Sequence, residues 1–403
     1  MKQAVAVFGS TGSVGTNTID VIQRNADRYY IDALTAHKNV DALLAQCISV
    51  KPRLAALADP QAAAELAVRL QRAGSETRVV TGDSALCEIA SDRQIPIVMA
   101  SIVGFAGLVP TFTAAQCGKK ILLANKESMV VAGEILNKAA RDNGASFVPV
   151  DSEHNAIFQC LSDRDQVNRS VHSDNAEVVS LVLTASGGPF RQWTSTQMRD
   201  ATIAQATNHP NWSMGSKISV DSATMMNKGL EIMEACSLFS IDEKFIEVVV
   251  HPQSIVHSMV RFKDGSILAQ LGQADMRTPI ANALAWPHRI DAGVPPLNVS
   301  QLNGLEFEEP DVSRFPCLEL ARQALRKGGA ASAVLNAANE VAVDFFLQGS
   351  IGFTDIAKIN MHALETTTLD NPSTIDDLVG VDDSVRQLTR QFIECGLKPA
   401  ELS

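Results

Sequence analysis

Residues 4–15 read AVAVFGSTGSVG, an apolar strand-forming run that breaks into a glycine-rich turn, and a helical pattern follows over residues 16–25. Strand, glycine-rich turn and helix in this order are typical of dinucleotide-binding domains. There the glycines let the backbone approach a pyrophosphate, and the helix N-terminus receives it. The spacing of Gly9, Gly12 and Gly15 is a variant of the usual motif. A tight turn that binds no ligand therefore stays an alternative.

The second predicted strand, residues 30–36, ends in His37, Lys38 and Asn39. An acidic residue at this place would bind the adenosine ribose of NAD, whereas a lysine can bind the additional phosphate of NADP. The sequence therefore favours NADP. An exposed lysine at the start of a helix is the alternative interpretation of Lys38.

Apolar runs and helical patterns alternate through the next part of the chain. Strands are predicted at residues 53–58, 78–80, 97–100 and 121–124. Helices are predicted up to about residue 73 and near residues 106–117. This alternation predicts a parallel, doubly wound sheet with helices on both faces.

Polar residues follow the last two strands of this predicted sheet. Asn125, Lys126 and Glu127 come directly after the strand 121–124, where such sheets bind ligands, although a plain helix start has the same composition. The strand 146–150 ends in Asp151, Ser152 and Glu153. In an extended chain the two carboxylates would point the same way, and a divalent cation would compensate their charges. Such a pair is by itself more often solvated surface.

Residues 209–231 read HPNWSMGSKISVDSATMMNKGLE and combine polar groups with almost no apolar periodicity. A core element has a different composition. The stretch predicts a mobile loop that ends near Gly215, a short strand at residues 217–220 and a helix that begins at Asp221 or Ser222.

This predicted helix offers an anion site. Ser222 would lie at its N-terminus, where backbone N–H groups and the helix dipole favour a negative charge, and Asn227 and Lys228 would add donors. Glu231 shares a face with Asn227 and would complete an oxygen ligand set with Asp151 and Glu153, which suits Mg²⁺ or Mn²⁺. An ordinary capped helix with solvated charges is the alternative.

The remaining sequence predicts the domain organisation. A strand at residues 178–184 opens into a long polar segment, residues 186–216, which we interpret as an active-site lid, with a disordered insertion as the alternative. Residues 245–271 predict a sheet with a hairpin that supplies a dimer edge. The predicted division is an NADPH-binding domain at 1–150, a catalytic domain at 151–286, a linker at 287–311 and a C-terminal helical domain at 312–403.

Composition excludes several classes of protein. The chain has 403 residues, a net charge of −11 and no basic run, so neither nucleic acid nor an anionic membrane is an expected partner. No apolar run approaches the roughly 20 residues of a membrane span, and we find no signal-peptide pattern, so a cytoplasmic protein is expected. The seven cysteines are scattered, which argues against zinc and against a disulfide framework.

Eight segments together resemble the 1-deoxy-D-xylulose 5-phosphate reductoisomerase family. They read GSTGSVG, LLANKES, PVDSEHNAIFQ, ASGGPFR, HPNWSMGSKISVDSATMMNKGLE, HPQSIVHSMV, QLGQADMRTPIA and LNAANE. The match is close and spans nearly the whole chain. It implies a homodimer with an N-terminal Rossmann-like NADPH-binding domain, a central α/β catalytic domain and a C-terminal helical bundle. It also implies a role in the methylerythritol phosphate route to isoprenoid precursors.

The resemblance also implies roles for individual residues. The metal ligands would be Asp151, Glu153 and Glu231, and the catalytic residues would be these three with Lys126 and His209. The cofactor contacts would be Thr11, Gly12, Ser13, Val14, His37, Lys38, Asn39, Asn125, Glu127 and Gly215. The substrate contacts would be Lys126, Ser152, Glu153, Ser186, His209, Ser222, Asn227, Lys228 and Glu231. The position of His37 is often glycine in the family, but an imidazole can still donate to a phosphate.

The expected reaction uses NADPH and one divalent cation (Mn²⁺, Mg²⁺ or Co²⁺) to isomerise and reduce 1-deoxy-D-xylulose 5-phosphate to 2-C-methyl-D-erythritol 4-phosphate. The cation would bind the ketone and the neighbouring hydroxyl, and NADPH would then deliver a hydride. One rival is an ordinary NADP-dependent dehydrogenase of a phosphorylated sugar or semialdehyde. Another is an NADP-sensing regulatory protein. The three acidic residues argue against both.

Overall fold

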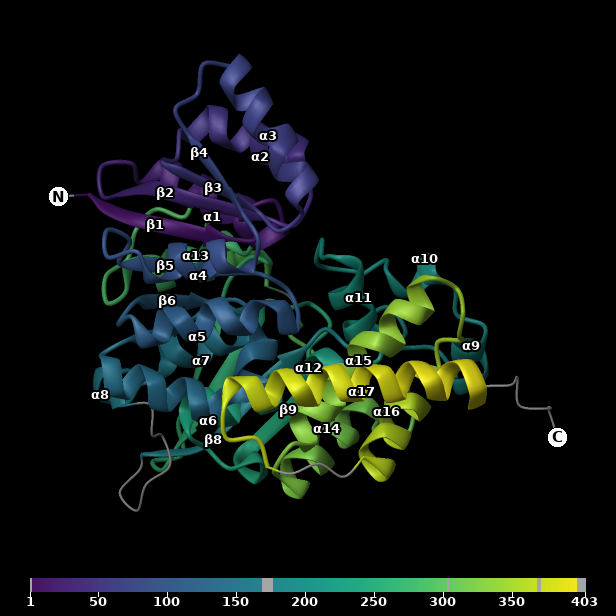
Figure 1. The fold of residues 1–403 in the computed structure, drawn as a ribbon. Coiled ribbons are helices and arrows are strands. Elements are labelled where there is room, and N and C mark those ends of the chain that lie inside the picture. Colours follow the sequence, from purple (N-terminus) through teal and green to yellow (C-terminus); the bar gives the residue numbers. More distant parts are fainter. Residues whose placement is uncertain (1, 169–176, 303, 368–370, 397–403) are drawn as a thin grey trace. The chain divides into compact units, whose positions relative to one another are not determined.

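The computed structural model describes residues 2–168, 177–302, 304–367 and 371–396, so the predicted C-terminal segment 312–403 lies partly outside the described residues (Figure 1). The chain forms two compact units. Unit 1 comprises Met1–Ser128, Leu136–Phe158 and Asp275–Leu297. Unit 2 comprises Met129–Ile135, Gln159–Ala274 and Asn298–Ser403. The passage from Leu297 to Asn298 lies in the segment that was predicted as a linker.

Unit 1 is built on a seven-stranded sheet in the order β4-β3-β2-β1-β5-β6-β7, and all its strands are parallel. The strands are β1 Gln3–Phe8, β2 Tyr29–Ala36, β3 Leu54–Leu57, β4 Arg78–Thr81, β5 Ile97–Ala100, β6 Lys120–Leu123 and β7 Ser146–Pro149. The strand order reverses between β1 and β5, which places helices on both faces and leaves a crevice at the carboxyl ends of the strands. The predicted doubly wound fold is confirmed.

The helices that belong wholly or in part to unit 1 connect these strands (Figure 1). They are α1 Ser13–Arg24, α2 Val40–Val50, α3 Pro60–Arg72, α4 Asp83–Ser91, η1 Phe105–Gly107, α5 Leu108–Gln116, α6 Lys126–Asn143, α7 Ser152–Cys160 and α13 Arg277–Ala285. Helix α13 comes from far along the chain and packs against α1, β6 and β7. Arg277 fastens it there, with ion pairs of 2.6 Å to Asp275 and 3.1 Å to Asp20 of α1.

Unit 2 contains a four-stranded mixed sheet in the order β11-β10-β8-β9. The strands are β8 Val178–Ala185, β9 Ile246–Val250, β10 Val256–Phe262 and β11 Ile267–Leu271. Strand β10 is antiparallel to β8 and β11, whereas β8 and β9 are parallel. The sheet and hairpin predicted over residues 245–271 are therefore confirmed. Strand β11 lies at the edge, and its burial pattern is mostly exposed.

The helices of unit 2 are α8 Asp163–Asn168, α9 Ser195–Arg199, α10 Ile203–Ala206, α11 Ser216–Ala223, α12 Met226–Phe239, η2 Glu243–Phe245, η3 Val299–Gln301, α14 Cys317–Lys327, α15 Ala331–Leu347, α16 Asp355–Thr366 and α17 Ile375–Gly396. Several of them form a layer around α15 (Figure 1). Helix α15 contacts α11, α14, α16 and α17, which explains why most of its residues are buried. The predicted C-terminal helical region is confirmed over the described residues.

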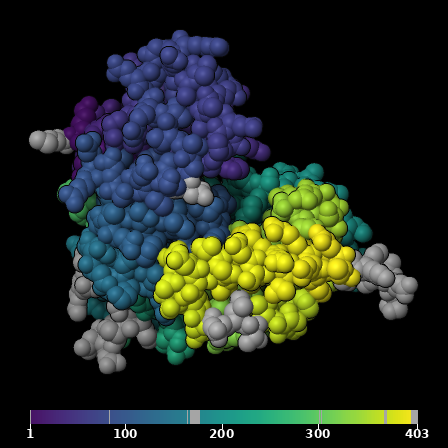
Figure 2. Space-filling view, viewed as in Figure 1, coloured from purple at the N-terminus to yellow at the C-terminus, as the bar shows by residue number. Residues whose placement is uncertain are grey.

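Helix α17 has one buried side and one side at the surface of the protein. Its buried residues Leu378, Val381 and Val385 recur at helical spacing and face the layer, while the other side of the helix lies on the surface (Figure 2). None of the helices in the described residues is long and apolar enough to cross a membrane.

The predicted strand at residues 217–220 is wrong. These residues belong to α11, in which the Ser219 amide donates to the Gly215 carbonyl over 3.0 Å. The sequence SKISV alternates polar and apolar residues and therefore looked like a strand. In α11 the consecutive residues Ser219, Val220 and Asp221 are 1%, 0% and 1% exposed, so the helix is enclosed on more than one side. The alternation of polar and apolar residues therefore does not separate a buried face from an exposed one here.

Candidate active site

The candidate residues of unit 1 gather at one edge of its sheet. The carboxyl ends of β1, β2, β6 and β7 all meet at this edge, because the strands are parallel. The residues that follow these four strand ends are Thr11, Gly12, Ser13 and Val14 after β1, His37, Lys38 and Asn39 after β2, Asn125, Lys126 and Glu127 after β6, and Asp151, Ser152 and Glu153 after β7. The sequence-predicted cofactor and acidic residues of this unit therefore share one ligand-binding edge.

The three glycines of the first turn have different reasons to be glycine. Gly9 has φ 74°, and a Cβ on Gly15 would lie 2.4 Å from the Gly9 carbonyl oxygen. The backbone conformation at Gly9 and the close backbone contact at Gly15 therefore each require a glycine, whether or not a ligand is bound. Gly12 has φ −80°, and a Cβ there would meet only the Gly9 oxygen, at 3.4 Å. Gly12 is also the N-cap of α1 with no side-chain cap, so the helix start stays open for an anion.

The residues after β2 lie at the surface. His37, Lys38 and Asn39 are all exposed. The Asn39 side chain caps α2 by accepting from the Ala42 amide over 3.1 Å, so it has a structural task as well. An exposed lysine just before a capped helix agrees with the predicted phosphate contact and equally with the alternative of a plain helix start.

Asn125 connects two loops of this edge. Its Oδ1 accepts from the Ser128 amide over 2.7 Å and caps α6, while its Nδ2 donates to the Gly104 carbonyl over 2.8 Å. The loop after β5 is thereby tied to the start of α6. This cap holds Lys126 and Glu127 in the first turn, where they are 9% and 4% exposed.

Asp151 does not continue an extended chain, so the predicted geometry of the acidic pair is wrong. Helix α7 begins at Ser152, and the Asp151 carbonyl accepts from the Asn155 amide over 2.8 Å. The side chain of Asn155 anchors this turn by donating to the Pro149 carbonyl over 2.8 Å. Glu153 therefore lies in the first turn of a helix, where the helix dipole stabilises its charge.

The Asp151 carboxylate has a lysine and a histidine as neighbours, and the sequence analysis predicted neither. Lys126 Nζ lies 2.6 Å from its Oδ2, and His154 Nδ1 lies 3.7 Å away. Burial raises the pKa of Asp151, but the charge of Lys126 and the interaction with His154 outweigh it and hold the pKa below its usual range. The carboxylate is therefore ionised and ready to act as a ligand.

In unit 2, Ser186 and His209 form a polar pair. His209 Nε2 lies 2.8 Å from Ser186 Oγ, and His209 Nδ1 accepts from the amides of Asn211 and Trp212 at 3.2 and 3.0 Å. Because Nδ1 is an acceptor, the ring proton must be on Nε2. Ser186 Oγ accepts from that proton and from the Gly188 amide over 3.1 Å. This leaves the hydroxyl proton of Ser186 for donation to a bound anion.

The predicted position of Ser222 at a helix N-terminus is also wrong. Ser222 lies in the last turn of α11, and Met225, with φ 58°, turns the chain into α12. A helix start without a side-chain cap is instead found at α12, and Asn227 and Lys228 lie in the first turn of that helix. A Cβ on Gly188 would lie 2.6 Å from the Ser222 carbonyl oxygen. The turn after Ser186 therefore packs directly on the end of α11, which brings Ser222 beside this turn.

Glu231 lies inside α12 and is 0% exposed. Asn227 and Lys228 both donate to its carboxylate. The shared face of Asn227 and Glu231 is therefore confirmed. Both donors of the predicted anion site are in contact with Glu231, which the sequence analysis did not predict. A lysine and an amide compensate the charge of this buried carboxylate.

The segment predicted as a lid forms the wall of a cavity of about 400 Å³. Its polar run contains the short helices α9 and α10, each with a capping box, which the sequence analysis did not identify. Gly215 ends the segment as the N-cap of α11, with nothing within 4 Å of a Cβ placed there. The cavity is lined by Ser186, Gly188, Pro189, Phe190, Arg191, Gln192, Trp193, Gln205, Asn208, Pro210 and Pro252.

A Rossmann-like sheet with an open glycine turn, together with a second unit that carries clustered hydrogen-bond donors and a buried carboxylate, is the architecture of a dinucleotide-dependent enzyme. Comparison with known proteins gives the family. The chain matches the model of 1-deoxy-D-xylulose 5-phosphate reductoisomerase over residues 5–133, that of its C-terminal domain over 147–239, and that of the DXP reductoisomerase C-terminal domain over 271–388. The chain belongs to the 1-deoxy-D-xylulose 5-phosphate reductoisomerase family.

Individual relatives agree with this assignment over nearly full length. The reductoisomerase of Cupriavidus pinatubonensis is 54% identical over 390 residues, which cover 97% of both chains. A DOX-P reductoisomerase solved in complex with NADPH, fosmidomycin and magnesium has a TM-score of 0.95 at 46% identity and covers 97% of this chain and 98% of its own. The enzyme from Zymomonas mobilis in complex with NADPH has a TM-score of 0.89 at 44% identity, covering 98% of this chain and 100% of its own.

Proposed function

We propose that the three carboxylates and the two polar clusters described above carry out the reaction for which the family is named. The chain is an oxidoreductase with an isomerase step: it converts 1-deoxy-D-xylulose 5-phosphate to 2-C-methyl-D-erythritol 4-phosphate with NADPH and a divalent cation, in the route to isoprenoid precursors. The observation that carries this conclusion is the full-length relationship, at 54% identity over 97% of the chain.

The proposed metal ligands are Asp151, Glu153 and Glu231. Three carboxylates are hard oxygen donors that suit Mg²⁺, Mn²⁺ or Co²⁺. A metal ligand of this kind must be a charged carboxylate, and a neighbouring lysine favours the charged form of Asp151 and of Glu231, Lys126 and Lys228 respectively. When bound, the cation would hold the ketone and hydroxyl oxygens of the substrate, and NADPH would supply the hydride. A cation on these carboxylates would also release both ammonium groups for contact with the substrate.

The proposed NADPH site follows the carboxyl edge of the sheet in unit 1. The open start of α1 at Gly12 can receive the pyrophosphate, and Lys38 and His37 are exposed where the additional phosphate of NADPH would lie. The full proposed set is Thr11, Gly12, Ser13, Val14, His37, Lys38, Asn39, Asn125, Glu127 and Gly215.

The proposed sugar-phosphate site uses donors from unit 2. Ser186 offers its hydroxyl proton, His209 fixes that hydroxyl, and the first turn of α12 offers Asn227 and Lys228. Ser222 is beside the turn that follows Ser186, and Ser152 and Lys126 are the proposed contacts from unit 1. Binding energy from the phosphate, remote from the reacting carbons, then helps to orient the ketone. His209 and Lys126 complete the catalytic residues, and Glu153 and Glu231 also contact the substrate oxygens.

A direct assay tests this function. Oxidation of NADPH should require both 1-deoxy-D-xylulose 5-phosphate and an added divalent cation, and the product should be the branched polyol phosphate. An ordinary dehydrogenase would reduce a preformed aldehyde without the cation. Turnover of NADPH that persists unchanged in excess chelator would refute the metal-dependent mechanism.

Further properties belong to the same proposal. Homodimerisation is supported by the exposed edge strand β11, where Ile267, Leu268 and Leu271 are 46%, 49% and 39% exposed. Sedimentation analysis of the chain and of a Leu268→Lys variant would test it. A cytoplasmic location agrees with seven free cysteines. We also propose that the chain is divided by function as the sequence predicts. Residues 1–150 form the NADPH-binding domain, residues 151–286 the catalytic domain with the lid 186–216, residues 287–311 the linker and residues 312–403 the C-terminal helical domain.

A further inference from the structure

A chain of buried polar groups in unit 2 connects α11 to the C-terminal helices. Lys217 Nζ lies 2.9 Å from Asp221 Oδ2, and Asn339 Nδ2 donates to Asp221 Oδ1 over 2.7 Å. Asn360 Nδ2 then donates to Asn339 Oδ1 over 3.0 Å. Asp221 is 1% exposed, and both asparagines are 0% exposed. We call these four residues the amide ladder.

The direction of every bond in the amide ladder follows from the charge of Asp221. A carboxylate can only accept, so Asn339 must present its Nδ2 to Asp221 and its Oδ1 to Asn360. Removing one donor would leave a buried charge with too few partners, which is costly at such low exposure. Asn339 belongs to the LNAANE segment, residues 335–340, to which the reaction assigns no task.

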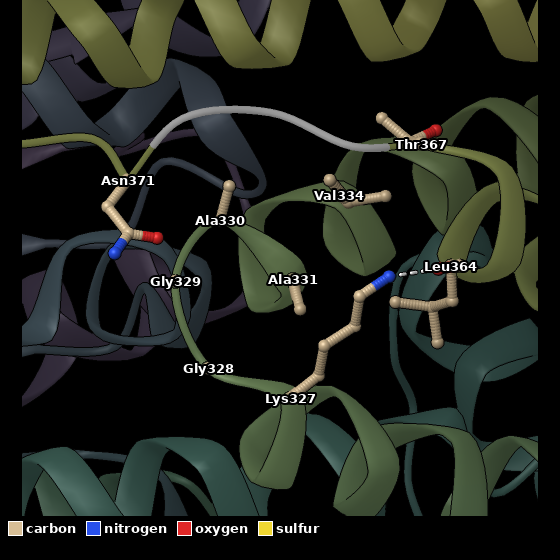
Figure 3. A pocket seen from close by; sticks show the side chains of 9 residues that line it. All are labelled: Lys327, Gly328, Gly329, Ala330, Ala331, Val334, Leu364, Thr367 and Asn371. Atoms are coloured by element: carbon tan, nitrogen blue, oxygen red, sulfur yellow. Dashed lines mark hydrogen bonds between the residues drawn. The ribbon is translucent and has the colours of Figure 1, made fainter.

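The far end of the amide ladder is held firmly. Asn339 lies on α15 and Asn360 on α16, and these two helices pack against each other. Lys327 at the end of α14 donates to the Leu364 carbonyl of α16 over 2.6 Å, beside a cavity of about 150 Å³ at the α14–α15 turn (Figure 3). The helices that carry the two asparagines are therefore fixed relative to each other and to α14.

The near end of the amide ladder lies beside the proposed sugar-phosphate residues. Asp221 directly precedes Ser222, and the Ser222 carbonyl is in close contact with Gly188, two residues after Ser186. Helix α11 also leads through Met225 into the first turn of α12, which carries Lys228. A change in the position of α11 would therefore move the Ser222 hydroxyl and the turn that supports Ser186.

We propose that Asn339 is a positioning residue that sets α11, and through it the sugar-phosphate site, by its bond to Asp221. It contacts neither the substrate nor the cofactor. The inference rests on the proposed assignment of Ser186, Ser222 and Lys228 to the phosphate. It adds that affinity for the phosphorylated sugar depends on a side chain in the C-terminal helices.

The test is a charge swap in the full-length enzyme. Asn339→Asp keeps the shape of the side chain but places a second carboxylate beside Asp221. The KM for 1-deoxy-D-xylulose 5-phosphate should therefore rise at least about tenfold. This is the magnitude expected when one buried charge-assisted hydrogen bond is lost. The KM for NADPH should stay the same. Asp221→Asn combined with Asn339→Asp restores every hydrogen bond and moves the charge by one position. The new amide at position 221 accepts from Lys217 and donates to the new carboxylate at position 339, which also accepts from Asn360. This double variant should recover the KM of the original enzyme.

Two further variants make the result decisive. Asn336→Ala removes another fully buried asparagine of the same segment that bonds to Glu340 instead, and should leave the KM for the sugar unchanged. Lys228→Ala tests the phosphate assignment itself. If Lys228→Ala leaves the KM unchanged, the proposed site is wrong. If Lys228→Ala raises it but folded Asn339→Asp does not, only the positioning role is wrong.

Folding is monitored by circular dichroism for every variant. If Asn339→Asp does not fold, the double variant alone decides. A folded double variant with the original KM supports the inference. A folded double variant that keeps a raised KM overturns it, because all hydrogen bonds of the amide ladder would then be present without their expected effect. A double variant that does not fold overturns it as well, because the inference requires the exchanged pair to replace the original one.

Discussion

The glycine turn after β1 allows a matched pair of substitutions that separate folding from cofactor binding. In Gly15→Ala the new Cβ would lie 2.4 Å from the Gly9 carbonyl oxygen and 2.5 Å from Ser10 Cα. These are backbone atoms of the same turn and can move only if α1 moves. Overpacking of this kind costs about 1–3 kcal/mol, so the urea midpoint of unfolding should fall clearly.

Gly12→Ala should have the opposite profile. The Gly12 backbone, with φ −80° and ψ 174°, suits any residue, and the new Cβ would meet only the Gly9 oxygen, at the ordinary contact distance of 3.4 Å. The free energy of unfolding should change by less than about 0.5 kcal/mol. If the pyrophosphate approaches the backbone here, the methyl group excludes it. The Kd for NADPH should then rise at least about tenfold, which corresponds to about 1.4 kcal/mol.

The assay is titration of NADPH fluorescence against each purified variant, with urea unfolding followed by circular dichroism. Gly15→Ala should lose stability, and Gly12→Ala should lose cofactor affinity while keeping stability. An unchanged NADPH affinity in folded Gly12→Ala would mean that the turn is only a structural connection. The proposed cofactor site would then have to be abandoned.

Four other outcomes are expected. Asp151→Asn, Glu153→Gln and Glu231→Gln should each cut turnover by orders of magnitude with the fold intact, and full activity in a folded Glu231→Gln enzyme would exclude the metal assignment. Trypsin should cleave after Arg191, Arg199 or Lys217 more slowly once NADPH and a substrate analogue are bound, whereas equal rates would contradict closure of the lid. A chelator joined through three carbons to a phosphonate should compete with the sugar phosphate, with Lys228→Ala weakening the phosphonate end and Glu231→Gln the chelating end; unaltered affinity in both variants would disprove the two-anchor site. The hydrogen bond from Arg277 lowers the pKa of Asp275, so its stabilisation is present above the unfolded pKa near 3.8 and is lost as the pH falls through the lower folded pKa. Asp275→Asn should therefore lower the free energy of unfolding by about 1 kcal/mol at pH 7, and a difference that did not shrink at low pH would contradict this pairing.

The sequence alone was sufficient for the parallel sheet of unit 1. Buried parallel strands are continuous apolar runs, as at residues 97–100 and 121–124, and the turn at Gly9 has a local signature. The ends of these strands also indicated where Asn125 and Asp151 would lie, because parallel strands share one carboxyl edge. These features depend on spacing along the chain, which a single sequence displays.

Only the tertiary structure decided how the polar residues are paired. Residues 217–220 alternate like a strand, but they belong to a helix in which Asp221 is bonded to Asn339, 118 positions further along the chain. The same holds for Lys126, whose ammonium group forms an ion pair with Asp151 that the sequence analysis did not predict. A buried charge selects its partners by distance in space, and one sequence contains no record of those distances.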